Sequence, residues 1–147
     1  MSIKRLGLSC GAVFLIVFSY DFVLHNIMLK ADYVVTGYLW RSPEDMPKYF
    51  GALLFGQLLL SFAFCATYAF LLRARAGACT GLIYGLLAGL LLCGPNFIFH
   101  AVQPMPLDLV LKWTVGRVIQ TALAGLVLGK LYRPEPIPAG VPEAVIA

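Results

Sequence analysis

The stretch GLIYGLLAGLLLC, residues 81–93, places a glycine or a cysteine at every fourth position of an otherwise apolar run. Four residues make slightly more than one helical turn, so Gly81, Gly85, Gly89 and Cys93 lie along one face of a helix. A face without bulky side chains lets a second helix approach until the two backbones touch, which is typical of helix packing in membranes. The stretch therefore predicts a membrane helix with one closely packed face.

Three further apolar segments accompany this one. The four segments cover about residues 6–29, 49–72, 77–102 and 109–132, and each is near the roughly 20 residues that cross a bilayer. Of the 147 residues, 61% are hydrophobic and 12% are charged, which is too little polar surface for a soluble domain. Only helices satisfy their own backbone in lipid at these lengths. The sequence predicts an all-α fold, an integral membrane bundle of four transmembrane helices formed by residues 1–133.

The last of these segments repeats the small-residue pattern in a shorter form. Thr121, Gly125 and Gly129 are again four residues apart and share one helix face. The pattern does not say whether the partner of either face lies within the chain or in another copy. We expect five glycines to be helix-packing positions: Gly81, Gly85, Gly89, Gly125 and Gly129.

The lysines and arginines at the ends of the segments indicate how the helices are oriented. If the four helices alternate in direction, one side of the membrane receives Lys4, Arg5, Arg73, Arg75, Lys130 and Arg133. On the other side, three basic residues are offset by three acidic ones, Asp32, Glu44 and Asp45. Because cytoplasmic loops carry the excess of lysine and arginine, we expect both termini in the cytoplasm and the protein in the inner membrane. The proline-rich residues 134–147 are predicted to form a disordered cytoplasmic tail.

The net charge argues against nucleic acid as a partner, and the cysteines argue against two kinds of structural site. The formal charge is +4, but the basic residues form no patch or run, so the excess is better explained by orientation in a membrane. We therefore expect the lipid bilayer, together with a homo-oligomer or a larger membrane complex, as partners, and no nucleic acid. The four cysteines form no CxxC pair, which argues against a zinc site or a disulfide framework.

A few polar residues interrupt the apolar segments, and counting along each helix places them at similar depths. Asp21 lies about eight residues below the outer end of the first helix, roughly 12 Å at the helical rise per residue. Arg117 lies about as deep in the fourth helix and Gln57 about as deep in the second, whereas Asn96 is slightly shallower and the histidines are nearer the surface. The predicted binding site, in the outer half of the bundle, consists of Asp21, His25, Gln57, Asn96, His100 and Arg117.

Asp21 and Arg117 need each other in this environment. Each alone costs at least ~2.5 kcal/mol in hydrocarbon, whereas at matching depth the two charges can neutralise each other. Gln57 or Asn96 can meet the remaining hydrogen-bond capacity, and His25, one turn above Asp21, can donate a ring proton to the carboxylate. Two interpretations stay open: a structural clasp that fixes the order of the helices, or a functional site.

Three short motifs suggest a resemblance. An aspartate late in the first helix is followed by LKADYVVTGYLWR at residues 29–41, then by GLIYGLLAG at 81–89 and LKW at 111–113. Over residues 10–133 this layout resembles small four-helix bacterial inner-membrane proteins that are described only as domains of unknown function. The resemblance implies a four-helix membrane fold and no particular activity.

Three classes of function are compatible with these residues. The first is a non-enzymatic accessory or assembly protein whose polar cluster is a clasp. The second is a small-solute or proton-linked transporter or channel subunit, which with four helices per chain implies a homo-oligomer. The third is a haem protein in which His25 and His100 are axial ligands of haem b. No nucleophile–base pair or metal-ligand set favours an enzyme, and we expect no catalytic residue, no metal and no cofactor under the first two hypotheses.

Overall fold

The computed structural model describes residues 3–72 and 76–132, and in these residues every regular element is helical, with no strand. The all-helical prediction is therefore confirmed for the described part of the chain. The long helices begin and end within a few residues of the four apolar segments; the predicted tail at 134–147 lies outside the described residues. In chain order the α-helices are α1 (Ile3–Val23), α2 (Lys30–Val35), α3 (Phe50–Leu71), α4 (Ala78–Val102) and α5 (Leu107–Leu131).

Within the described residues, three stretches of helix are long and apolar enough to cross a membrane: Lys4–Met28, Met46–Leu71 and Ala78–Val102. This composition indicates a membrane protein. Helix α5 has the same length as α4, 25 residues, but it is not among the three. It carries four charged residues, Asp108, Lys112, Arg117 and Lys130.

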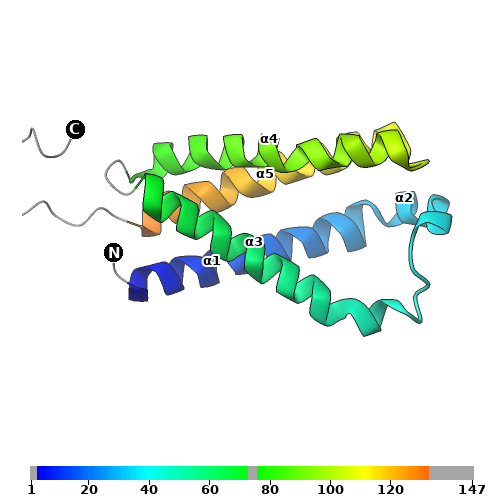
Figure 1. The fold of residues 1–147 in the computed structure, drawn as a ribbon, viewed down its shortest axis with the longest axis horizontal. Helices are drawn as coiled ribbons and strands as arrows, with labels where there is room; N and C mark the ends of the chain where they lie inside the picture. Colours follow the sequence, from blue (N-terminus) through cyan, green and yellow to red (C-terminus); the bar gives the residue numbers. More distant parts are fainter. Residues whose placement is uncertain (1–2, 73–75, 133–147) are drawn as a thin grey trace, which may run out of the picture.

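The long helices run back and forth between two ends of the molecule (Figure 1). Helices α4 and α5 lie side by side along their length, α1 lies next to α5, and α3 crosses α1 obliquely. The starts of α1 and α4 and the ends of α3 and α5 lie at one end of the molecule, which we call the inner end. The other end, which we call the outer end, carries α2, the start of α3 and the connection from α4 to α5.

The close contact between α4 and α5 is made by glycine. The buried residues of α4 are Gly81, Gly85, Gly89 and Cys93, the four positions that the sequence places on one helix face. A Cβ atom added to Gly81 would overlap the carbonyl oxygen of Gly125 and lie 2.9 Å from the Cα atom of Gly129. Gly81, Gly85, Gly125 and Gly129 therefore meet one another inside one chain, Gly89 packs against Thr121 and Val118 of α5, and the smooth face of α4 is already covered.

The first helix ends in an unusual way. After Val23 the backbone continues as a π-helical turn, η1 (Leu24–Met28), in which the amide of Leu29 donates to the carbonyl of Leu24 over 2.9 Å. A π-helical turn carries one more residue than an α-helical turn and is frequent at functional sites. The short helix α2 follows directly, so the chain turns over the outer end of the bundle just above His25.

Helix α3 buries side chains in the bundle along only half of its length. Its buried residues all lie between Ser61 and Ala69, where Phe64, Cys65 and Tyr68 join the apolar core of the inner half. Residues 50–60 include no buried side chain, because α3 diverges from α1 toward the outer end (Figure 1). The outer half of α3 reaches the other helices through a polar side chain described next.

Candidate functional site

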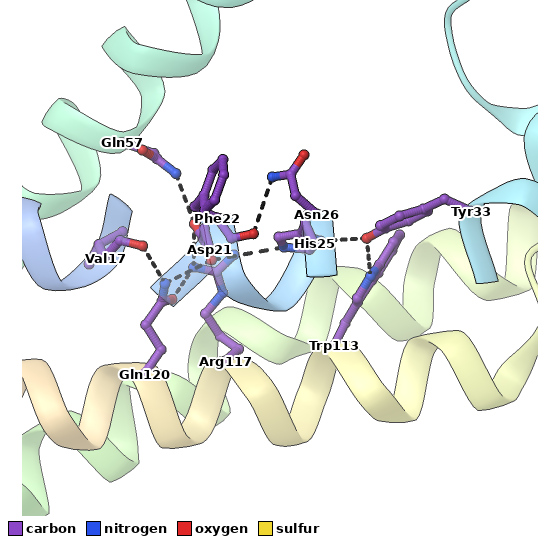
Figure 2. Close-up of polar contacts among 10 residues, drawn as sticks. All are labelled: Val17, Asp21, Phe22, His25, Asn26, Tyr33, Gln57, Trp113, Arg117 and Gln120. Atoms are coloured by element: carbon purple, nitrogen blue, oxygen red, sulfur yellow. Dashed lines mark hydrogen bonds and ion pairs between the residues drawn. The ribbon is translucent and has the colours of Figure 1, made fainter. Parts of the chain in front are cut away.

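The centre of the polar cluster is the carboxylate of Asp21 on α1, whose two oxygens each accept a hydrogen bond from another helix (Figure 2). Gln57 Nε2 on α3 donates to Oδ2 over 2.9 Å. Gln120 Nε2 on α5 donates to Oδ1 over 2.7 Å. With its side chain 15% exposed, Asp21 joins three helices through short bonds to its charged group, which are stronger than bonds between neutral groups.

Arg117 lies beside this carboxylate, as counting by depth predicted, but the two are not in direct hydrogen-bond contact. The distance from Arg117 Nη1 to Asp21 Oδ2 is 3.9 Å. The same nitrogen donates to Gln120 Oε1 over 2.5 Å. The ion pair is therefore bridged by Gln120, whose amide accepts from the guanidinium and donates to the carboxylate.

Gln120 is the residue that the sequence reasoning missed. Its side chain is fully buried, with 0% of its surface exposed, and its Nε2 atom also donates to the backbone carbonyl of Val17 over 3.0 Å. The signal was present: a glutamine one turn after Arg117 in an apolar helix faces the same way as the arginine. A search restricted to charged residues and their nearest neutral partners passes over it.

His25 belongs to the cluster by position, although its contact with Asp21 is longer than a hydrogen bond. Its Nε2 atom lies 3.9 Å from Asp21 Oδ1, beyond hydrogen-bond range. Its Nδ1 atom is hydrogen-bonded to the hydroxyl of Tyr33 on α2, and Trp113 Nε1 on α5 donates to the same hydroxyl over 2.8 Å. The rings of His25 and Tyr33 are stacked with their centroids 5.8 Å apart.

An aromatic layer covers the cluster from the outer end. Tyr33, Trp40 and Trp113 are in mutual ring contact, with centroids between 5.4 Å and 6.4 Å apart. Burial raises the pKa of Tyr33 to about 12, with Trp113 opposing the shift through its hydrogen bond. Tyr33 and Trp40 were not among the predicted site residues, because their role depends on α2 folding back over the bundle.

Two of the expected site residues lie elsewhere. His100 directs its Nδ1 atom at the carbonyl of Met105, 2.6 Å away, in the connection between α4 and α5. Within residues 3–72 and 76–132, no hydrogen bond or ion pair joins Asn96 or His100 to the cluster around Asp21. The two histidines thus contribute to separate contacts, and the side chains around them give the haem hypothesis no support.

One acceptor in the cluster is unpaired. The oxygen Oε1 of Gln57 is buried without a hydrogen-bond partner, and the same holds for the hydroxyl of Ser61 one turn further along α3. Buried polar atoms are paired in the great majority of cases, so the amide oxygen of Gln57 leaves unused hydrogen-bonding capacity on the side chain that contacts Asp21. In the described parts of the chain, no three His, Cys, Asp or Glu side chains come close enough to hold a metal ion.

The comparisons with known proteins add no identification. No protein-family model, no curated protein and no solved structure matches this chain. The site therefore has to be interpreted from its own geometry: one carboxylate, one guanidinium, one imidazole and two amides, contributed by three long helices and covered by aromatic rings.

Replacing Gln120 by leucine is expected to destabilise the bundle by about 2 kcal/mol. The change leaves Asp21 and Arg117 without the amide that joins them, and unpaired buried polar groups cost about 1–3 kcal/mol. The measurement is the midpoint of reversible unfolding in mixed detergent micelles. Gln103→Leu is the matched control, because Gln103 is exposed in the connection after α4. An equal effect of the two substitutions would contradict the bridging role.

Proposed function

We propose that the protein is a small four-span protein of the inner membrane, with both termini in the cytoplasm, that acts as a non-enzymatic accessory or assembly protein. The observation that carries this proposal is the pairing of Asp21 with donors from α3 and α5. A carboxylate held by two amides and faced by an arginine is suited to fixing three helices in place. The same bonds leave it poorly suited to attacking or deprotonating a substrate.

The internal neutralisation of Arg117 also supports α5 as the fourth span. A charged side chain in the middle of an apolar helix opposes insertion, but here the Arg117 side chain is 27% exposed and its Nη1 atom lies 3.9 Å from the carboxylate of Asp21. Of the other charged residues of α5, Asp108 and Lys130 lie in its first and last turns, where they can reach the polar headgroups. Lys112 lies one turn after Asp108, with its Nζ atom 3.4 Å from that carboxylate. Helix α5 can therefore cross beside α4 without an unpaired charge at its centre.

The orientation predicts which ends of α4 react with a thiol reagent that cannot cross the membrane. Cys79 is exposed at the inner end of α4, and Gln103 is exposed just past its outer end. With all other cysteines replaced by serine, Gln103→Cys is expected to be labelled in cells whose outer membrane alone is permeabilised. Cys79 is expected to react only after the inner membrane is opened. Labelling of Cys79 from outside would contradict the orientation.

An assembly role requires a partner, and the surface available for one differs from the glycine face. That face packs against α5, whereas the outer half of α3 contributes no buried residue. Native mass spectrometry from a mild detergent tests the proposal. A defined oligomer or a stable complex with a second protein is expected, and a single species at the mass of one chain would contradict an assembly role.

A second candidate is a proton-linked or small-solute transporter acting as a homo-oligomer. It is favoured by the unpaired Gln57 Oε1 beside a carboxylate that is 15% exposed. Proteoliposomes containing a pH-sensitive dye separate the two candidates. The accessory role predicts no proton flux above that of empty vesicles, whereas transport predicts a flux that Asp21→Asn abolishes while the protein stays folded.

A further inference from the structure

The hydroxyl of Tyr33 fixes the direction of the hydrogen bonds around His25. Trp113 Nε1 can only donate, so the oxygen of Tyr33 accepts from it over 2.8 Å. The hydroxyl proton then remains available for the other partner, His25 Nδ1. Because the pKa of Tyr33 is raised to about 12 by burial, the hydroxyl keeps this proton at any physiological pH. Tyr33 is therefore able to donate this proton to a bare Nδ1 atom.

The carboxylate on the other side of the ring favours the same tautomer. A neutral imidazole carries one proton, and with Nδ1 bare this proton is on Nε2. Nε2 is the atom that faces Asp21 Oδ1 at 3.9 Å. A proton on Nε2 is attracted by the carboxylate. In the other tautomer, the lone pair of Nε2 would point at the negatively charged carboxylate, which is unfavourable. Both neighbours thus select the tautomer of His25 that is protonated on Nε2.

We propose that His25 is a proton-binding site reached from the outer end of the molecule, and that proton uptake reverses its hydrogen bond with Tyr33. A second proton can enter only on Nδ1, since Nε2 already carries one. Tyr33 must then accept from both His25 and Trp113, and its own proton turns away to another acceptor. The side of the membrane that supplies the proton rests on the proposed orientation, whereas the reversal does not.

The access and the local backbone support such a site. The side chain of His25 is 34% exposed, so the ring is not sealed inside the bundle despite the aromatic layer next to it. His25 also lies in the π-helical turn η1, directly before α2, which carries Tyr33. A change in the hydrogen bond between these two side chains therefore acts on the junction between the first long helix and the aromatic layer above it.

The charges around His25 determine what proton uptake does to the cluster. Asp21 on α1 attracts the imidazolium, and Arg117 on α5 repels it. Tyr33 from α2 and Trp113 from α5 contribute no charge. From α3, the neutral amide of Gln57 contacts the same carboxylate. Asp21 Oδ1, which His25 would approach, is the oxygen that Gln120 holds at 2.7 Å. The protonated ring therefore competes with the bridge between Asp21 and Arg117.

Ring-nitrogen NMR of the detergent-solubilised protein tests the tautomer directly. The chain has two histidines, so His100→Gln leaves His25 as the source of every histidine signal. We expect a proton on Nε2 and none on Nδ1 at about pH 8, and protons on both nitrogens after titration toward pH 5. A proton on Nδ1 at about pH 8, or a ring that never takes up a second proton, would overturn the proposal.

Tryptophan emission reports the reversal at Tyr33. The chain has two tryptophans, and Trp40→Phe leaves Trp113, the donor to Tyr33, as the reporter. Acidification from about pH 8 to about pH 5 is expected to shift the Trp113 emission, and His25→Gln or Tyr33→Phe is expected to abolish the shift. His100→Gln is the matched control and is expected to retain it. A shift that survives His25→Gln would assign the response to another group.

Discussion

Replacing Gly85 by leucine is expected to separate α4 from α5 and to remove more than about 3 kcal/mol of stability. A Cβ atom at this position would overlap the carbonyl oxygen of Thr121 and lie 2.9 Å from its carbonyl carbon. The obstructing atoms are backbone, so no rotamer change relieves the contact and the whole helix must move. Overpacking that forces backbone shifts costs typically 1–3 kcal/mol and occasionally more. Leucine adds a branched side chain to a contact that already excludes a methyl group.

The measurement is reversible unfolding in mixed micelles, followed by the helical circular dichroism and by tryptophan emission. Gly56→Leu is the control, because an added Cβ atom at Gly56 on α3 meets nothing within 4 Å. It introduces the same side chain on a face turned away from the other helices and is expected to change stability by less than about 0.5 kcal/mol. A small effect of Gly85→Leu would contradict the close packing of α4 on α5.

Removing the charge of Asp21 is expected to have the second largest effect. Asp21→Asn keeps the shape of the side chain and an acceptor for Gln120, but it leaves Arg117 without its counter-charge. Breaking one partner of a buried ion pair costs about 3–5 kcal/mol. We expect a loss near the lower end, about 3 kcal/mol, because the pair is 3.9 Å apart and both side chains are partly exposed.

The double variant Asp21→Asn with Arg117→Gln separates loss of charge from loss of shape. If the two charges neutralise each other, removing both is expected to restore at least about 1 kcal/mol relative to the sum of the single effects, as double-mutant cycles of contacting residues do. Strictly additive effects would show that Asp21 and Arg117 act independently. The comparison uses the same unfolding measurement as the glycine variants.

The helices were predictable because membranes allow few alternatives. An apolar run of about 20 residues without turn residues is expected to be a helix. The long helices α3, α4 and α5 follow three of these runs, whereas α1 ends at Val23 and continues as a π-helical turn. The glycine face of α4 was equally readable, since spacing by four fixes which residues share a face. What spacing could not give was the partner: that Gly85 meets Thr121 depends on how the connection at 103–106 returns the chain.

The site was predictable in depth but not in direction around the helix axis. Counting residues placed Asp21, Gln57 and Arg117 at one level, and the structure brings these three together. The same count included Asn96, which no hydrogen bond or ion pair among the described residues joins to the cluster, because depth alone ignores rotation. Tyr33 and Trp113 could not be assigned to the cluster, since the π-helical turn at Leu24–Met28 and the fold-back of α2 leave no signal in the spacing of polar residues.

The glycine stripes have a consequence for register. The small residues repeat every four positions. If α4 moved along α5 by four residues, about 6 Å, small residues would again face each other, and two of three small-residue contacts would re-form. The small residues therefore allow close packing of α4 and α5 in more than one register, and they do not by themselves determine the register. The alignment is set by the connection at 103–106, too short to allow a shift, and by contacts without a fourfold repeat, such as Cys93 Sγ donating to the carbonyl of Thr114 over 3.6 Å. With a longer connection, α4 and α5 would pack equally closely, but in either of two registers.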